Sequence, residues 1–244
     1  LGIGAFRITS QLLPLATHPE SGYRLEELDG GEALVAAYRA AGRLAAARGI
    51  RLSFHPDQFV VLGSARPDVV ESSVREMDHH GRIAALIGAD TICLHGGGLV
   101  GGAEAAGSRL LDGIARLSDA ARSRLALEND DRVWSPAALL PLCDRAGVPF
   151  IYDVHHHRCL ADGASVADVT GASLATWRRA GREPYFHLSS PREGWTGRDR
   201  RPHADYIDPA DVPDEWNGLA VTIDLEAKAK ELAVRQLQAA GIPA

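Results

Sequence analysis

Short apolar runs alternate with longer amphipathic segments along most of the chain. The short runs carry apolar and β-branched residues between turn-forming residues, a pattern that predicts strands. These runs are Ala5–Ile8, Arg51–Phe54, Thr91–Leu94, Leu125–Glu128, Phe150–Asp153, Tyr185–Leu188 and Leu219–Ile223. The amphipathic segments predict helices at Leu34–Arg48, Pro67–Ile87, Ser108–Ser118, Pro136–Ala146, Ser173–Ala180 and Glu226–Ala239.

The order of these elements predicts the fold class. Gly49, Gly88, Gly147 and Gly181 each follow a helical pattern and precede a strand, where a left-handed residue would end the helix. Repeated strand–helix units predict a mainly parallel sheet, either open or closed into a barrel. No GxGxxG follows the first strand and no GxxxxGK[ST] occurs, which argues against a nucleotide cofactor and favours the barrel. We therefore predict an α/β fold, a TIM-type (β/α) barrel with seven of its eight strands, as a single domain over residues 1–244.

Composition excludes several classes of protein. The chain has 244 residues, of which 45% are hydrophobic, so a disordered or collagen-like chain is ruled out. No run of about 18 apolar residues occurs, so no membrane-spanning helix is expected. Cys93, Cys143 and Cys159 are odd in number and lack CxxC spacing, which predicts a reduced compartment and a cytoplasmic protein. No charged leader precedes an apolar stretch after Leu1, so no signal peptide is expected in this sequence. The formal charge of −6 disfavours binding of nucleic acid through bulk basic charge unless bound cations correct the sum locally.

Metal-type ligands stand at the carboxyl ends of six predicted strands. In a (β/α) barrel these ends converge on one face, where active sites are built. Two further ligands come from loops, one of them in the irregular segment Ser189–Pro213. Eight ligands exceed the three that a catalytic zinc takes from the protein, so we predict two to three divalent ions, with Zn, Mn, Fe and Co all suited to mixed ligation. The set is His55, His95, Glu128, Asp153, His156, His187, His203 and Glu226.

The other histidines have simpler interpretations. A single histidine at a strand end is more often a hydrogen-bonded structural residue, and only the agreement of six strand ends favours a metal cluster. His79 and His80 lie in a helical pattern and are interpreted as surface or packing residues. His155 and His157 flank His156, and alternation at a strand end would point only some of the three inward.

Eight segments, in order along nearly the whole chain, match the motifs of one enzyme family. They are Phe6–Ser10 with Pro14 and His18, His55–Phe59, Cys93–Gly97, Leu127–Asp130, Tyr152–His156, Phe186–Ser190, Pro202–Ile207 and Asp224–Lys228. Each motif alone is weak, but the ordered set is specific. The chain resembles the UV damage endonucleases, relatives of endonuclease IV among the xylose-isomerase-like barrels.

The resemblance implies an enzyme that nicks double-stranded DNA 5′ to a UV photoproduct, an abasic site or a similar lesion. It implies divalent metal ions, manganese first and zinc, cobalt or magnesium as alternatives. Glu128 would bridge two ions, with Asp153, His187 and Glu226 on one, His55 and His95 on the other, and His156 and His203 on a third. Glu128, Glu226 and His187 are then the catalytic candidates. The implied contacts to DNA and lesion are Arg7, His18, Gln58, Phe59 and Lys228.

Three departures from the family pattern stand out. The family has a βα unit before the segment that begins here, and a lysine where this chain has Tyr185. It also has a Gln-Tyr pair that probes the lesion, where this chain has Gln58-Phe59. An apolar ring at Phe59 can still wedge into a base stack. The alternative is that Phe59 and residues 60–62 pack under the rim of the barrel.

Physical chemistry is compatible with the implied reaction. Phosphodiester hydrolysis needs an activated water, a clamp on the non-bridging oxygens and neutralisation of the leaving oxygen, and adjacent divalent ions supply all three. Two alternatives stay open at this stage. One is a xylose-isomerase-like sugar isomerase or epimerase, which shares strand-end His, Glu and Asp ligands; the other is an inactive metal-binding relative.

Overall fold

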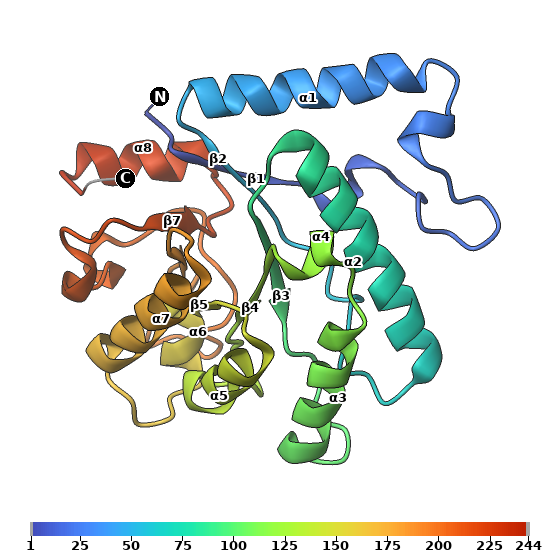
Figure 1. The fold of residues 1–244 in the computed structure, drawn as a ribbon. Helices are drawn as coiled ribbons and strands as arrows, with labels where there is room; N and C mark the ends of the chain where they lie inside the picture. Colours follow the sequence, from blue (N-terminus) through green and yellow to red (C-terminus); the bar gives the residue numbers. More distant parts are fainter. Residues whose placement is uncertain (1, 243–244) are drawn as a thin grey trace. The chain divides into compact units, whose positions relative to one another are not determined.

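The computed structural model describes residues 2–242, which divide into two compact units. The N-terminal unit comprises residues 5–126, and the C-terminal unit combines residues 2–4 with residues 127–242. The strands follow the order β1 to β7, each beside its neighbours along the chain, and the described strand pairs are parallel. Figure 1 shows the succession of strands and helices. This is the α/β pattern of parallel βα units that the sequence predicts. The prediction of a single domain stays a prediction.

The strands are β1 (Ala5–Ile8), β2 (Arg51–Phe54), β3 (Thr91–His95), β4 (Leu125–Glu128), β5 (Phe150–Asp153), β6 (Tyr185–Leu188) and β7 (Thr222–Leu225). The α-helices are α1 (Gly31–Ala47), α2 (Pro67–Ile87), α3 (Ala103–Ala115), α4 (Asp119–Arg122), α5 (Pro136–Ala146), α6 (Val154–Cys159), α7 (Val166–Ala180) and α8 (Glu231–Ala239). Short 3-10 helices are η1 (Ser10–Leu12), η2 (Leu25–Glu27), η3 (Pro209–Asp211) and η4 (Asp214–Trp216).

The predicted seventh strand, Leu219–Ile223, is misplaced. Leu219 N–H donates to the Trp216 carbonyl in a turn, and the bonds to β6 begin where Thr222 N–H donates to the Pro184 carbonyl. The predicted start of the last helix at Glu226 is also wrong. Glu226 N–H donates to the Leu188 carbonyl of β6, and Lys230 has a φ of 51°, so the chain turns before α8 begins.

The first predicted helix, Leu34–Arg48, is displaced at both ends, and the third begins at Ala103 and not at the predicted Ser108. Two further boundaries are wrong for reasons of capping. Helix α7 begins seven residues before the predicted Ser173 because the Ser165 hydroxyl accepts the Asp168 N–H at 3.1 Å. Helix α3 covers residues 103–115, and the predicted end at Ser118 is instead the cap of the separate helix α4. All four glycines that the sequence analysis places at helix ends have positive φ, between 64° and 79°.

The N-terminal unit builds its core between β1–β3 and the helices that follow them. Helix α1 packs against α2, and α2 packs against α4 (Figure 1). Phe54, Ile92 and Met77 are almost completely buried there. A Cβ on Gly113 would lie 2.4 Å from the Leu62 carbonyl oxygen, so only glycine lets α3 approach the segment after β2 this closely.

The C-terminal unit places its strand ends side by side. Asp153 pairs with His187 across β5 and β6, and His187 pairs with Asp224 across β6 and β7. Helix α7 covers β5 through hydrogen bonds to Phe150, whose carbonyl accepts from the Trp177 indole N–H at 2.8 Å. This register aligns the carboxyl ends of successive strands. Among residues 2–242, no helix is long and apolar enough to cross a membrane.

Candidate metal centre

Six of the eight predicted ligands lie together in the C-terminal unit, in two groups that share one carboxylate. The ligand atoms of each group lie within 4.8 Å of one another. The first group is Glu128, Asp153, His187 and Glu226, and the second is His156, His203 and Glu226. Glu226 therefore belongs to both groups, a feature that sequence order alone did not indicate.

The parallel register explains why these side chains meet. Glu128 and Asp153 are the last residues of β4 and β5, and His187 lies beside Asp153 in the ladder. Glu226 directly follows β7 and is tied to β6 by its backbone N–H. Because parallel strands end at the same edge of a sheet, each strand contributes a ligand at the same level.

A short helix orients the histidines after β5. The Asp153 side chain caps α6 by accepting the His156 N–H at 2.8 Å. The interpretation of residues 155–157 as an alternating strand end is wrong, because in a helix the three rings point in three directions and all are buried. His157 contacts the Tyr152 hydroxyl at 2.8 Å, and His155 Nδ1 lies 3.3 Å from the Ser189 carbonyl oxygen.

The carboxylates and imidazoles of the two groups lie close to one another. Glu128 Oε1 is 2.9 Å from His187 Nδ1 and 3.3 Å from His156 Nδ1. Glu226 reaches both neighbours, with Oε1 3.5 Å from His187 Nδ1 and Oε2 3.5 Å from His203 Nδ1. Each glutamate thus connects two histidines.

Burial lowers the pKa values of the histidines in this region, whereas nearby carboxylates raise them. Burial alone would lower the pKa of His156, but Asp153 and Glu128 outweigh it and raise that pKa well above its usual value. The pKa of His155 is lowered, first by burial, although Asp153 opposes the shift. Since a metal ligand must be an unprotonated imidazole, an ion bound by His156 would displace a proton.

The donor set fits a divalent ion. Glu128, Asp153 and His187 are completely buried. Asp153 Oδ2 accepts no hydrogen bond from the described residues and lies 3.5 Å from His156 Nδ1. A buried acceptor left in this way costs about 1–3 kcal/mol, a cost that a cation bound to this oxygen would remove. Mixed carboxylate and imidazole ligation suits Zn, Mn, Fe or Co.

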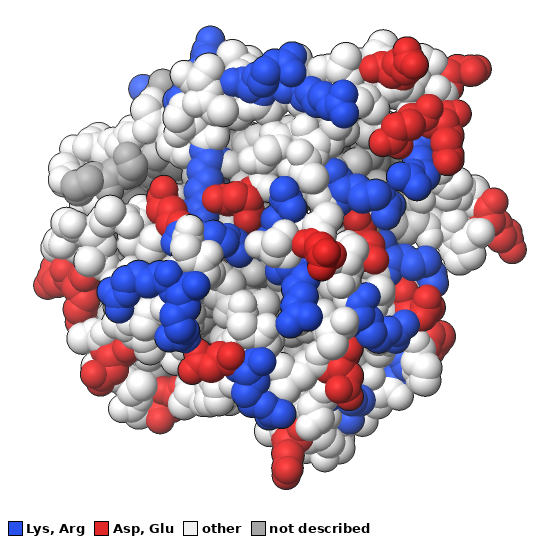
Figure 2. Space-filling model, viewed as in Figure 1, with Lys and Arg blue, Asp and Glu red and all other residues white. Residues whose placement is uncertain are grey.

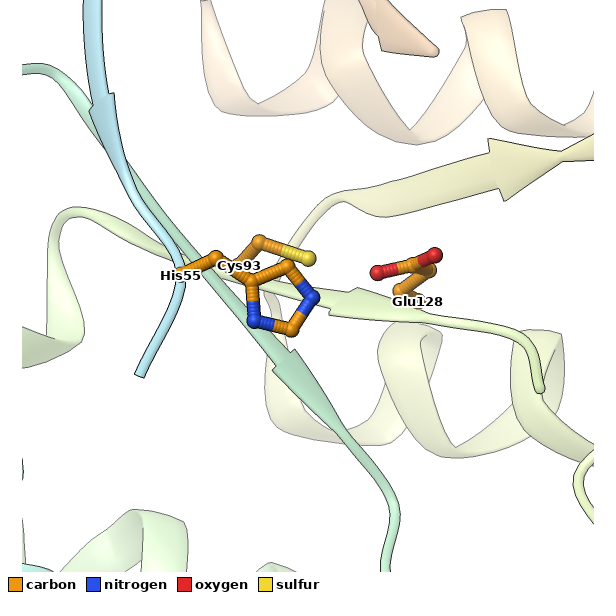
Figure 3. A group of neighbouring side chains, drawn as sticks. All are labelled: His55, Cys93 and Glu128. Carbon is orange, nitrogen blue, oxygen red and sulfur yellow. The ribbon is translucent and has the colours of Figure 1, made fainter. Parts of the chain in front are cut away.

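The remaining two predicted ligands lie in the N-terminal unit. His55 follows β2, His95 ends β3, and their ring centroids are 5.1 Å apart. Cys93, which the ligand prediction omits, has its sulfur within 4.8 Å of a ring nitrogen of His55. Figure 3 draws His55 and Cys93 beside each other, and it also draws Glu128 from the end of β4. Cys93 stands two residues before His95, so strand alternation puts both side chains on one face and could have identified it.

The loop after His55 carries the predicted lesion-probing pair. Phe59 is 78% exposed, and Gln58 is also exposed. Leu62 is only 1% exposed, and Val61 N–H donates to the Ser73 hydroxyl of α2 at 2.8 Å. The alternative in which this loop packs into the core therefore holds for Leu62 and is wrong for Phe59.

The other predicted DNA contacts occupy surface or half-buried positions. His18 is exposed, and its Nδ1 accepts the backbone N–H groups of Glu20 and Ser21 in a turn. Arg7 is half-buried on β1, and Lys228 is exposed in the turn after Glu226. None of these three belongs to a metal-type group of the described residues.

Three further residues from the sequence analysis are buried: two histidines of α2 and Tyr185. His79 and His80 are packing residues of α2. Tyr185, at the position where the resemblance implies a lysine, donates its hydroxyl hydrogen to Asp224 Oδ2 at 3.3 Å. The Tyr185 ring meets that of His187 edge-on, with 5.7 Å between centroids.

Charge on the surface is mixed. Figure 2 shows Lys and Arg side chains interspersed with Asp and Glu on the face that it draws. The 26 basic and 32 acidic residues of the chain leave a formal charge of −6. A field of one sign, of the kind that draws DNA from a distance, is absent from this face of the described residues.

Comparison with known proteins identifies relatives of one family. The sequence model of the family described as "UV-endonuclease UvdE" matches residues 1–242. A UV-damage endonuclease from Neurospora crassa is 36% identical over 255 residues, which cover 97% of this chain and 37% of that protein. A UV DNA damage endonuclease from Bacillus cereus strain B4264 is 32% identical over 243 residues, covering 96% of this chain and 74% of the relative. The chain thus spans well under half of the Neurospora protein.

Solved structures agree with the fold class. The crystal structure of SacUVDE matches with a TM-score of 0.86 at 31% identity, over 99% of this chain and 82% of that one. Endonuclease IV from Thermus thermophilus matches with a TM-score of 0.65 at 23% identity, over 98% of this chain and 89% of that one. A D-tagatose 3-epimerase-like protein reaches the same TM-score at 14% identity, over 98% of this chain and 87% of that one. The last two likenesses concern the fold alone, and the predicted TIM-type (β/α) class is confirmed.

Proposed function

The chain belongs to the UV-endonuclease UvdE family, and from this membership we propose that it is a DNA repair endonuclease that nicks damaged duplex DNA with the help of divalent metal ions. The observation that carries the metal dependence is the buried donor set of the C-terminal unit, in which Asp153 Oδ2 has no hydrogen-bond donor among residues 2–242. The names of the two curated relatives, both UV damage endonucleases, support the reaction.

The proposed ligands divide by the groups described above. Glu128, Asp153, His187 and Glu226 would hold one ion, and His156, His203 and Glu226 a second. His55 and His95 are the proposed ligands of a further ion, and the bridging role of Glu128 stays a prediction. Divalent ions at such a site supply an activated water, a clamp on the phosphate oxygens and neutralisation of the leaving oxygen.

Polar contacts within the site orient the side chains of the proposed ligands. Glu128 Oε1 and Glu226 Oε1 both lie close to His187 Nδ1, at 2.9 and 3.5 Å, and so restrict the rotation of that ring. Asn129 O lies 2.9 Å from His156 Nδ1, which makes Nδ1 the donor and directs the lone pair of Nε2 elsewhere. Ligands held in this way lose less freedom when an ion binds.

The proposed substrate is duplex DNA that carries a UV photoproduct, an abasic site or a similar lesion, cut 5′ to the damage to leave a 3′-hydroxyl. The exposed Gln58 and Phe59 support recognition of a distorted stack, since an aromatic ring can wedge between bases where pairing is weakened. The sugar epimerases share only the fold with this chain, so they lend no support to the isomerase alternative.

The direct test is nicking of supercoiled plasmid before and after UV irradiation. We expect the purified protein to nick irradiated plasmid in Mn²⁺, to leave undamaged plasmid intact, and to lose activity in EDTA. Glu128→Gln should abolish nicking, while Glu231→Gln, at an exposed carboxylate in the first turn of α8, is the matched control that keeps it.

Metal content, measured by elemental analysis of the same samples, separates the alternatives. A protein that binds its ions and still fails to nick irradiated or abasic DNA would be the inactive relative. A protein that nicks equally well in EDTA would contradict the metal dependence.

A further inference from the structure

His155 is a buried imidazole that belongs to neither metal-type group of the C-terminal unit. Its Nδ1 lies 3.3 Å from the Ser189 carbonyl oxygen, and because a carbonyl only accepts, Nδ1 must be the donor. Its Nε2 is buried and has no hydrogen-bond partner among residues 2–242. A phenylalanine would fill the same space without leaving a nitrogen unsatisfied, so packing alone does not explain an imidazole at this position.

Apart from the ring of His156, its neighbour on α6, the partners of His155 lie in the long loop, residues 189–213, which follows β6. The Ser189 carbonyl is at its start, the Trp195 ring is 5.3 Å away between centroids, and the His203 ring is 5.1 Å away. His155 therefore touches the long loop at three points that are well separated in sequence.

The long loop is itself folded around these contacts. An antiparallel bridge joins Pro191 to His203, with Arg192 N–H donating to the Pro202 carbonyl at 2.7 Å. The Trp195 indole N–H donates to Asp211 Oδ1 at 2.6 Å, and Arg158 of α6 donates to the Asp211 carbonyl at 2.8 Å. Both α6 and the far end of the loop thus enclose the position of His155.

We propose that His155 is a positioning residue: it holds the long loop against α6 and thereby places His203 beside Glu226. The chain after β6 has no strand or α-helix of its own until β7, so His203 depends on such tertiary contacts for its position. His203 Nδ1 lies 3.5 Å from Glu226 Oε2, a spacing that a loosened loop would not keep. The consequence for metal binding rests on the proposed function, whereas the consequence for the loop does not.

The test uses two variants of the full chain. His155→Asn keeps a short donor toward Ser189 and removes the ring; His155→Phe keeps the ring and removes the donor. His157→Asn is the matched control, because His157 is an equally buried neighbour that contacts Tyr152 and Asp162 and not the loop. Thermal unfolding of each protein establishes that it is folded, and if His155→Asn does not fold, His155→Phe carries the test.

Trypsin provides the readout that needs no metal. The long loop contains Arg192, Arg198 and Arg200, none of which precedes a proline, so its opening appears as cleavage at these three sites, mapped by mass spectrometry. We expect cleavage there, in metal-free protein, to be several times faster in the His155 variants than in the wild type and the control. Cleavage elsewhere should be unchanged.

Titration with Mn²⁺ provides the second readout. We expect the weakest-bound ion to bind roughly 10-fold less tightly in the His155 variants, the scale of effect seen when a residue that orients a ligand is lost. Nicking should return when the Mn²⁺ concentration is raised. Unchanged loop cleavage and unchanged Mn²⁺ affinity in both variants would overturn the inference. If the wild type binds no metal, the proposed function fails, while the trypsin comparison still decides the role of His155.

Discussion

Glu226 is the residue that the two metal-type groups of the C-terminal unit share. Its two oxygens face different histidines, Oε1 toward His187 and Oε2 toward His203. A carboxylate with both oxygens engaged can serve two ions, whereas an amide offers only one acceptor and a donor. The exchange of a single oxygen for NH₂ should therefore disturb both groups.

We accordingly expect Glu226→Gln to lose more than one ion per chain, and Glu231→Gln to lose none. Elemental analysis after dialysis against a weak chelator measures both. The bridging role that the resemblance implies for Glu128 predicts the same loss for Glu128→Gln, and the two variants can be compared directly. Retention of all but one ion by Glu226→Gln would show that its carboxylate serves a single site.

The side chain of Phe59 is exposed, so its role in lesion recognition can be tested without disturbing the fold. A core Phe→Ala change costs about 3–5 kcal/mol, but an exposed ring leaves no cavity. We expect Gln58→Ala with Phe59→Ala to change the free energy of unfolding by no more than about 0.5 kcal/mol and to leave metal content intact. Nicking at a photoproduct should fall far more than nicking at an abasic site, which is already unstacked.

Urea denaturation and paired nicking assays measure these effects. Val60→Ala, at the next, half-buried position of the same loop, is the control. Equal losses on both lesions would assign the pair to general DNA binding.

At the scale of elements, helix α2 carries a buried titratable group away from the candidate metal ligands. The pKa of His79 falls to about 4, chiefly because the ring is buried, with His80 and Arg82 lowering it further and Glu76 opposing. An unfolded histidine has a pKa of about 6.5. Below that pH His79 binds a proton in the unfolded chain but not in the folded protein. The contribution of His79 to the free energy of unfolding is therefore complete above about pH 6.5 and is lost as the pH falls toward about 4.

The expected contribution of His79 to this loss is about 1–3 kcal/mol. Urea denaturation at about pH 7.5 and about pH 5 should show a smaller difference for His79→Gln than for the wild type. His18→Gln, at an exposed histidine of the same unit, is the control and should behave as the wild type. An identical pH dependence in His79→Gln and wild type would mean that the ring is hydrated in the folded protein.

At the scale of the whole molecule, net charge opposes the proposed substrate. A formal charge of −6 repels a polyanion, and the buried carboxylates of the metal centre add to this repulsion where the ions are absent. Divalent ions bound at the proposed centre would reverse the local sign.

We therefore expect duplex DNA to bind more weakly in EDTA than in Mn²⁺, at equal ionic strength. Fluorescence anisotropy with a labelled lesion-containing duplex measures the two affinities, and Ca²⁺ in place of Mn²⁺ controls for screening by a divalent ion in solution. The candidate contacts to the DNA backbone are Arg7, Arg192, Arg198, Arg200 and Arg201. Equal affinity in EDTA and Mn²⁺ would mean that these arginines suffice for binding without the ions.

Features that arise from local interactions could be predicted from the sequence. Five strands have the predicted bounds, and β3 is one residue longer. The prediction works because short apolar runs between turn residues are typical of the buried strands of a parallel sheet. Gly88, Gly147 and Gly181 end their helices because only glycine adopts positive φ without strain. Six of the eight ligand candidates were found because they stand at the ends of predicted strands, and that position can be recognised without knowing their partners.

Features that depend on residues distant in sequence could not be predicted before the fold was known. The seventh strand begins where its hydrogen bonds to β6 begin, and not where its apolar residues do. Residues 155–157 have no helical pattern of their own, yet contacts of His157 with Tyr152 and of His155 with Ser189 accompany a helix there. The sharing of Glu226 between two groups follows from the register of β6 and β7, because a carboxylate selects its partners by position in space and not by distance along the chain.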